Sequence, residues 1–173
     1  MFKDFYIPSY EITPLTMAVI AKPQGNKDGA SYVLEEELEY TIEASPSKVM
    51  NDACKYLGSS LKGRQDGTRE ICGITHKAPI SIDPSSGMYF FPTTSPSNPK
   101  CSWIAHSHID QVNKAPDNCT EILFHNGKRI VLKVSYGSML NQVQRTAQFR
   151  YLLDHRIKYL QRHAADLVAE PQP

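Results

Sequence analysis

The most regular alternation of apolar and polar positions lies near the N-terminus. Leu38, Tyr40 and Ile42 alternate with acidic residues and a threonine, which is the period of two typical of a half-buried β-strand. We predict two strands, over 12–22 and 31–43, joined by the turn-forming run PQGNKDGA. The acidic face of the second strand discourages pairing with another sheet edge.

A helical period follows this strand pair. Ser45 suits an N-cap and Pro46 suits the first helical position, and Gly58 is a natural stop. We therefore predict a short helix over about 46–57. Its apolar face consists of Val49, Met50, Ala53, Cys54 and Leu57.

The middle of the chain has the short apolar runs and turn residues of a sheet. We predict strands over 68–75, 80–82, 88–91 and 102–112, with a turn over 83–87 and a loop at TTSPSNPK. The Asn126-Gly127 pair inside 120–134 is preferred in two-residue type I′ turns. That turn sets Leu123 opposite Ile130 and Ile122 opposite Val131, so both faces of the hairpin are apolar, as in the centre of a sheet.

From about 138 to 168 the period lengthens to that of a long C-terminal helix. The apolar positions form a seam that suits packing on the sheet, on a second subunit, or on both. We assign the end of this seam to oligomerisation. These positions are Leu152, Leu153, Ile157 and Leu160.

These elements predict an α+β fold with a mostly antiparallel β-sheet body. The 173 residues suit a single domain over 1–173, with the 138–168 helix as a possible oligomerisation element. No helix-turn-helix is expected, because a hairpin precedes the long helix.

Charge is unevenly distributed along the chain. The net charge is +1, but residues 1–44 carry eight acidic and three basic side chains, whereas the remainder carries ten acidic and sixteen basic ones. This asymmetry fits an anionic partner on one side of the molecule, although solvated surface charge gives the same composition. An acidic strand would be repelled by nucleic acid and should point away from it.

The chain contains no run of about 18 apolar residues and no N-terminal signal pattern. We therefore expect a cytoplasmic, nucleoid-associated protein without a membrane partner. Cys54, Cys72, Cys101 and Cys119 are widely and irregularly spaced. Such spacing in a reducing compartment favours free, buried thiols over disulfides.

Two groups of residues suggest a zinc site or a catalytic nucleophile, but each lacks other features that such a site requires. His106 and His108, with Cys101 and Cys119, have the ligand types of zinc, yet no CxxC or HExxH spacing accompanies them. A Cys-His nucleophile lacks an orienting group and an oxyanion site. We expect no metal, no cofactor and no catalytic residue.

Small residues and cations alternate directly after the first helix. Gly58, Gly63 and Gly67 lie among serines and cations, a composition that lets a backbone approach a phosphate chain closely. The residues alone leave open whether that phosphate belongs to DNA or to a small ligand. The candidate contacts on this loop side are Ser59, Ser60, Lys62, Arg64 and Lys77.

The long helix carries a second polar set. Amide and guanidinium side chains bind base edges and phosphates, although a solvated helix face contains the same residue types. The candidate contacts on this helix are Asn141, Arg145 and Arg150. Trp103 has the ring for base stacking, but a tryptophan beside Ile104 in a strand is more typical of a core.

Three runs resemble the ComK family, the competence transcription factors of Bacillus-type bacteria. They are CKYLGSSLKGRQDGTREICGITHKAPISIDPSSGMYFFP (54–92), KCSWIAHSHI (100–109) and NQVQRTAQFR (141–150). The resemblance implies a transcriptional activator of DNA-uptake genes that binds A/T-rich boxes of double-stranded DNA through the minor groove, as paired subunits. It also implies RNA polymerase and a proteolytic adaptor as partners.

Binding in the DNA minor groove has a physical basis in this sequence. An A-tract narrows the minor groove and concentrates negative potential, so Arg64, on a thin glycine-flanked loop, is expected to enter it. Two other functions are considered. An adaptor would bind proteins through the long helix, and a DNA-processing enzyme would need a carboxylate cluster, for which Asp66, Glu70 and Asp83 are too scattered.

Overall fold

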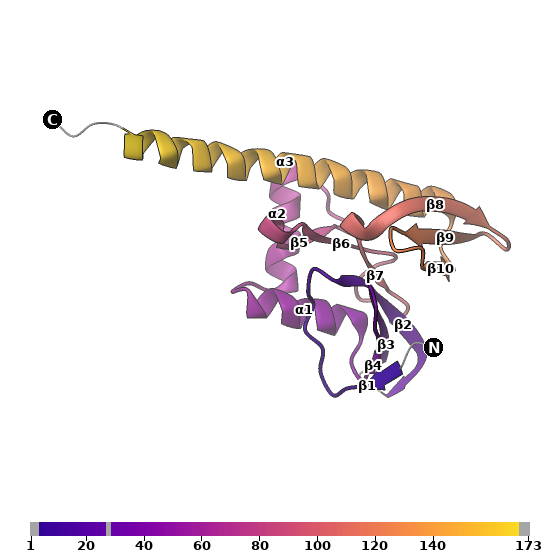
Figure 1. The fold of residues 1–173 in the computed structure, drawn as a ribbon. Coiled ribbons are helices and arrows are strands. Elements are labelled where there is room, and N and C mark those ends of the chain that lie inside the picture. Colours follow the sequence, from indigo (N-terminus) through magenta and orange to yellow (C-terminus); the bar gives the residue numbers. More distant parts are fainter. Residues whose placement is uncertain (1–3, 27–28, 170–173) are drawn as a thin grey trace.

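The computed structural model describes residues 4–26 and 29–169. It has the predicted α+β class, and it combines a seven-stranded sheet and a three-stranded sheet with three α-helices, one more helix than the sequence predicted (Figure 1). Only the β1–β4 pair is parallel among the described strand pairings. The large sheet has the order β1 (Asp4–Tyr6), β4 (Glu39–Ile42), β3 (Gly29–Glu35), β2 (Thr16–Asn26), β7 (Trp103–Ala105), β6 (Met88–Pro92), β5 (Ile80–Asp83); the small sheet has the order β10 (Arg129–Leu132), β9 (Cys119–Phe124), β8 (Ile109–Ala115).

The first helix, α1 (Pro46–Tyr56), confirms the expected element. The Ser45 hydroxyl accepts a hydrogen bond from the Lys48 amide at 3.2 Å, which satisfies one of the free N–H groups of the first turn. Val49, Met50 and Cys54 are buried, but Leu57 lies at the C-cap and is 45 % exposed. The predicted apolar face is therefore correct except at its last position.

The single strand predicted over 31–43 is wrong, because the chain turns in its middle. β3 and β4 form an antiparallel hairpin in which Ser31 lies opposite Ile42, and the Glu35 amide donates to the Leu38 carbonyl at 2.9 Å. The acidic run 35–39 thus forms the turn. Part of the turn predicted before β3 falls on 27–28, outside the described residues.

The loop predicted over 59–67 and the strand predicted over 68–75 are also wrong. Helix α2 (Leu61–Cys72) occupies this segment and ends at Gly73, whose φ of 70° is left-handed. The Ser60 hydroxyl caps it by accepting from the Gly63 amide at 2.9 Å. A glycine lowers the stability of a helix by about 1 kcal/mol, so Gly63 and Gly67 made a helix here unexpected from the sequence. A Cβ atom at position 63 would lie only 3.0 Å from Ser59 Oγ, so close packing favours glycine at this position.

The predicted register of the Asn126-Gly127 hairpin is shifted by one residue. Leu123 lies opposite Arg129, and Ile122 lies opposite Ile130. The Gly127 amide donates to the Phe124 carbonyl at 2.9 Å and Gly127 alone in this turn has a positive φ, 87°, as in a three-residue loop with a bulge rather than a type I′ turn. As a result, Val131 is 58 % exposed, and only one face of the hairpin is apolar.

The strand predicted over 102–112 is interrupted. A 3₁₀ turn at His106–His108 separates β7 in the large sheet from β8 in the small sheet. The chain needs this break to pass from one sheet to the other. The Asp83–Gly87 turn is confirmed: the Asp83 carboxylate accepts from the Ser86 hydroxyl at 2.6 Å and from the Ser85 hydroxyl at 2.7 Å, and these bonds lower the pKa of Asp83.

The large sheet has a hydrophobic core on each face. Neighbouring residues along a strand point to opposite faces, so Phe90 and Trp103 pack towards α1 while Phe91 and Ile104 pack towards the small sheet and the last helix. Trp103 is fully buried and its ring N–H donates to the Ser47 hydroxyl at 3.2 Å, which confirms it as a core residue. The sheet is therefore covered on both sides.

The last helix, α3 (Tyr136–Ala169), has 34 residues and confirms the predicted long helix. Its first half lies along the body, and its second half extends past the body towards the C-terminus (Figure 1). The β9–β10 hairpin precedes it, so no helix-turn-helix leads into α3 within the described residues. None of the described helices is long and apolar enough to cross a membrane.

Candidate nucleic-acid interface

Helix α2, the segment 74–78 and helix α3 meet at one polar surface, which we call the α2–α3 surface. A cavity of about 260 Å³ opens there and is lined mainly by α2 and by 74–78. Lys62 and Lys77, two of the predicted contacts, line this same cavity although fifteen positions separate them. Further side chains of the lining are Gln65, Asp66, Arg69 and His76.

Helix α2 contributes a row of polar side chains to this surface. Lys62, Gln65 and Arg69 are spaced by three and four residues, so they share one side of the helix. Lys62 lies 3.2 Å from Asp66, and Arg69 lies 3.9 Å from the same carboxylate. Exposed ion pairs of this kind are weak, so both cations remain available to a phosphate.

The segment 74–78 is held by helix α3. The buried Gln142 amide donates to the Lys77 carbonyl at 3.0 Å and to the Pro92 carbonyl at 2.7 Å. Lys77 has a φ of 48°, an uncommon left-handed conformation for a residue with a side chain, and its ammonium lies 3.4 Å from the Ser138 hydroxyl. Backbone strain of this kind concentrates at functional sites.

Arg145 borders the same surface from α3. Its guanidinium donates to the His76 carbonyl at 2.6 Å and to the Gln142 side-chain oxygen at 2.8 Å. Burial lowers the pKa of Arg145, but a guanidinium stays protonated in proteins. Because both acceptors are uncharged, the guanidinium is oriented without being neutralised. Asn141, one turn earlier on the same side of α3, is exposed.

Arg64 is not the projecting side chain expected from the sequence. It lies on α2, and its guanidinium donates to the Ile82 carbonyl at 3.4 Å, while its Nε is buried without a hydrogen-bond partner among the described residues. Its charge lies near Cys54 and lowers the pKa of that thiol, but burial outweighs this effect and raises it to about 11. Arg64 therefore points towards the body of the protein. Ser59 and Ser60 lie at the start of α2 and are not part of the cavity lining.

Arg150 lies on the other flank of α3 from Arg145. Its guanidinium donates to Nδ1 of His106 at 3.0 Å and lies 4.9 Å from the centre of the Tyr89 ring. Burial, and then the Arg150 charge, lower the pKa of His106 to about 4, so the imidazole is a neutral acceptor at pH 7. The structure thus gathers Lys62, Lys77, Asn141 and Arg145 but not the other predicted contacts.

The histidines and cysteines considered for zinc have separate surroundings. His106 accepts from Arg150, whereas His108 Nε2 lies 2.7 Å from the Pro14 carbonyl. The Cys101 thiol is buried near the Thr94 carbonyl, and the Cys119 thiol contacts the Asp117 carbonyl. Within 4–26 and 29–169, no three metal-ligating side chains come together.

Gln65, Arg69 and His76 were missed by sequence reasoning. Their spacing from Lys62 is informative only for a helix, and the sequence pattern favoured a loop and a strand there. The contact of Arg145 with the His76 carbonyl had no local sequence signal, because 69 positions separate the two residues.

Comparison with known proteins agrees with the resemblance seen in the sequence. The family model described as ComK protein matches residues 7–158. The Competence transcription factor of Bacillus subtilis (strain 168) is 37 % identical over 158 residues, which cover 89 % of this chain and 82 % of that protein. No solved structure matches. The match over most of its length shows that this chain belongs to the ComK family.

Proposed function

We propose that the chain is a DNA-binding transcriptional activator of competence genes and that the α2–α3 surface makes the DNA contact. The competence role follows from the family and from the relative that shares 37 % of its residues. The observation that supports the DNA surface is the gathering of Lys62, Arg69, Lys77 and Arg145 around one cavity. Membership in a family of transcription factors favours a regulator over an enzyme.

The distribution of charge supports this orientation on DNA. The acidic turn 35–39 leads into β4 near one edge of the large sheet, whereas β5, which packs beside α2, forms the other edge. Glu39 of β4 accepts the Tyr32 hydroxyl and lies 3.8 Å from the Lys128 ammonium, so this carboxylate is engaged within the protein. The basic surface can therefore approach DNA with the acidic turn 35–39 directed away from it.

The proposed contacts divide into two kinds. Lys62 and Arg69 on α2 bind phosphates and set the position of the protein, because both side chains are exposed. Lys77 and Arg145 are held by the backbone and by Gln142, so they are suited to a narrow A/T-rich minor groove, with Asn141 beside them. They take over the role first expected of Arg64.

The remaining predicted contacts have secondary roles in the proposal. Ser59 and Ser60 lie at the N-terminus of α2, where a phosphate passing along the surface would meet a favourable helix dipole. Arg150 has a structural role through its bond to His106. It would contact DNA only in a complex in which the duplex wraps around α3. Arg64 acts as a structural cation between α2 and Ile82.

The proposal includes self-association through α3 and paired A/T boxes. Two linked subunits convert weak half-site contacts into strong joint binding through effective concentration. The leucines and isoleucine of the seam are the candidate contacts, because the second half of α3 extends past the body (Figure 1) and Leu160 is 67 % exposed. RNA polymerase and a proteolytic adaptor remain proposed partners by family resemblance alone.

A salt series tests the DNA proposal. Binding of the full chain to a duplex with an A/T box and to a scrambled duplex is measured at increasing salt, for the parent and for Lys62→Ala/Arg69→Ala. We expect an A/T preference that persists at high salt. Removing two phosphate contacts should reduce the slope of log K against log salt by about 2. Equal binding of both duplexes at every salt concentration contradicts specific readout and favours the protein-adaptor alternative.

A further inference from the structure

The second half of α3 carries an apolar stripe that becomes more exposed along the helix, since Leu153 and Ile157 are partly buried and Leu160 is exposed. Past residue 153 the helix continues for sixteen residues to Ala169, or about 24 Å, and Leu160 is 67 % exposed. Leu153, Ile157 and Leu160 are spaced at i, i+4 and i+7, so they lie on one face. We call residues 154–169 with Leu153 the overhang. An isolated helix of this length is marginally stable in water, so its apolar face gains from a partner.

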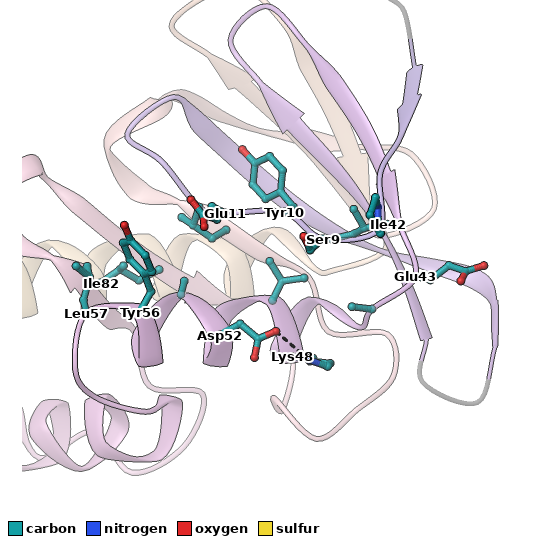
Figure 2. Close-up of a pocket in the computed structure, with 15 residues that line it drawn as sticks. Ser9, Tyr10, Glu11, Ile42, Glu43, Lys48, Asp52, Tyr56, Leu57 and Ile82 are labelled. Carbon is teal, nitrogen blue, oxygen red and sulfur yellow. Dashed lines mark hydrogen bonds and ion pairs between the residues drawn. The ribbon is translucent and has the colours of Figure 1, made fainter.

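A second exposed apolar surface lies on the opposite part of the molecule. A groove of about 350 Å³ separates α1 from the segment 8–12, and Figure 2 shows Tyr10 and Glu11 across it from the helix. Ile42 and Val49 form its buried lining, and Tyr56 at one end is 77 % exposed. We call this cavity the α1 groove. Its volume is within the range of about 300–1,000 Å³ of ligand pockets, enough for side-chain anchors but not for a whole helix.

The two surfaces carry opposite charges. The α1 groove is bordered by Glu11, Glu43 and Asp52, and its single cation, Lys48, lies 2.8 Å from Asp52. The overhang carries three cations, Arg156, Lys158 and Arg162, against two carboxylates, Asp154 and Asp166, and Lys158 lies 2.8 Å from Asp154. Arg156 follows Leu153 by three positions and therefore borders the apolar stripe. A cationic helix with apolar anchors matches an apolar groove with an acidic border.

We propose that the overhang of a second copy of this chain docks into the α1 groove, with Leu153, Ile157 and Leu160 as its anchors. Anchors at these spacings are characteristic of a helix bound in a groove. Because each chain carries both surfaces, two chains exchange overhangs in a two-fold dimer. The inference rests on the proposed function for the self-association of the activator, and it adds the surface that receives the helix. The α2–α3 surface shares no residue with either element.

Sedimentation velocity of full-length variants tests the exchange. The groove variant Tyr56→Ser/Leu57→Ser and the tail variant Ile157→Ser/Leu160→Ser each remove two apolar contacts. Tyr151→Ser/Tyr159→Ser is the matched control, since both tyrosines are exposed on α3 away from the stripe. We expect the dissociation constant of the dimer to rise at least about tenfold for the groove and tail variants and by less than about twofold for the control.

A mixing experiment identifies the partner surface. In an equal mixture, the intact overhang of the groove variant meets the intact groove of the tail variant, so the mixture should associate more strongly than either variant alone. A groove variant that associates like the parent overturns the proposal and indicates pairing between α3 helices. A parent that stays monomeric at every concentration also overturns it and assigns both surfaces to other proteins.

If a serine variant unfolds, two charge-reversal variants test the same docking. Glu11→Lys and Arg156→Glu should each weaken association, and the mixture or the double variant should restore it; failure to restore it counts against docking. Binding to a single A/T box below the dimer dissociation constant should equal that of the parent in all these variants. If the parent lacks A/T preference while the exchange is observed, the DNA proposal fails and the docking proposal stands.

Discussion

The two halves of helix α3 have the same apolar period but different surroundings. In the first half, Met139 and Phe149 are buried against the sheets, and Gln142 is buried with two hydrogen bonds to backbone carbonyls. The second half extends beyond the body in Figure 1, and its residues Leu160 and Leu167 continue the stripe but are exposed. Periodicity therefore identifies the face that a helix buries. It does not identify whether the burying surface belongs to the same chain.

The largest expected difference between the halves is in folding stability. Phe149→Ala should lower the free energy of unfolding by about 3–5 kcal/mol, because it opens a cavity and removes the edge-on contact with the Tyr89 ring at 5.7 Å. Leu160→Ala should change it by less than about 0.5 kcal/mol. Urea unfolding at a concentration at which the chain is monomeric measures both. Similar losses in both variants would show that the overhang packs against its own chain.

The hydrogen bond from Arg150, in the first half of α3, to His106 should be sensitive to acid. The folded pKa of His106, about 4, lies below its ordinary value near 6.5, so the unfolded chain takes up this proton first as pH falls. The stability held by neutral His106 is complete above about pH 6.5 and is lost as pH falls towards 4. The loss should reach about 2–3 kcal/mol, because protonation places a charge on a largely buried ring and the ring then no longer accepts from Arg150.

His106→Gln provides the control for this titration. Glutamine keeps an oxygen that can accept from Arg150 but does not titrate. The difference in stability between parent and variant, measured by urea unfolding at pH 7 and at pH 4.5, isolates His106 from the other histidines. An identical pH dependence in the two proteins would assign the acid sensitivity to other groups.

The sequence predicted helices α1 and α3 because their signals are local. Ser45 and Pro46 mark the start of α1, and a long apolar period with few interruptions marks α3. Helix α2 was missed because its stability depends on packing against α1, α3 and β5. Only Thr68 within it is buried, so no apolar stripe was available to reveal it.

The site was predicted in part for the same reason. Lys62, Lys77, Asn141 and Arg145 were identified by residue type, and the fold gathers them. Arg64 was given the wrong environment because loop residues point outwards, whereas a helix turns every third or fourth residue towards the body. The hairpin register was displaced by one residue because a glycine bulge replaced the expected turn, and such a shift reverses the faces of a strand.

The smallest expected difference between the two halves of α3 concerns DNA. Arg145 and Arg156 lie on nearly the same side of the helix, but only Arg145 is oriented by His76 and Gln142. Arg145→Ala should weaken binding to an A/T-box duplex by roughly 1–2 kcal/mol, and Arg156→Ala should change it less than about twofold at monomeric concentrations. Fluorescence anisotropy with A/T-box and G/C-substituted duplexes measures both, and thermal melting verifies that each variant is folded.

Arg145→Lys separates charge from orientation, since it keeps the cation but cannot make the paired bonds of the guanidinium. Equal losses for Arg145→Ala and Arg156→Ala on both duplexes would mean that α3 attracts DNA by net charge along its whole length, and the distinction between an anchored, DNA-contacting half and a docking half would no longer hold.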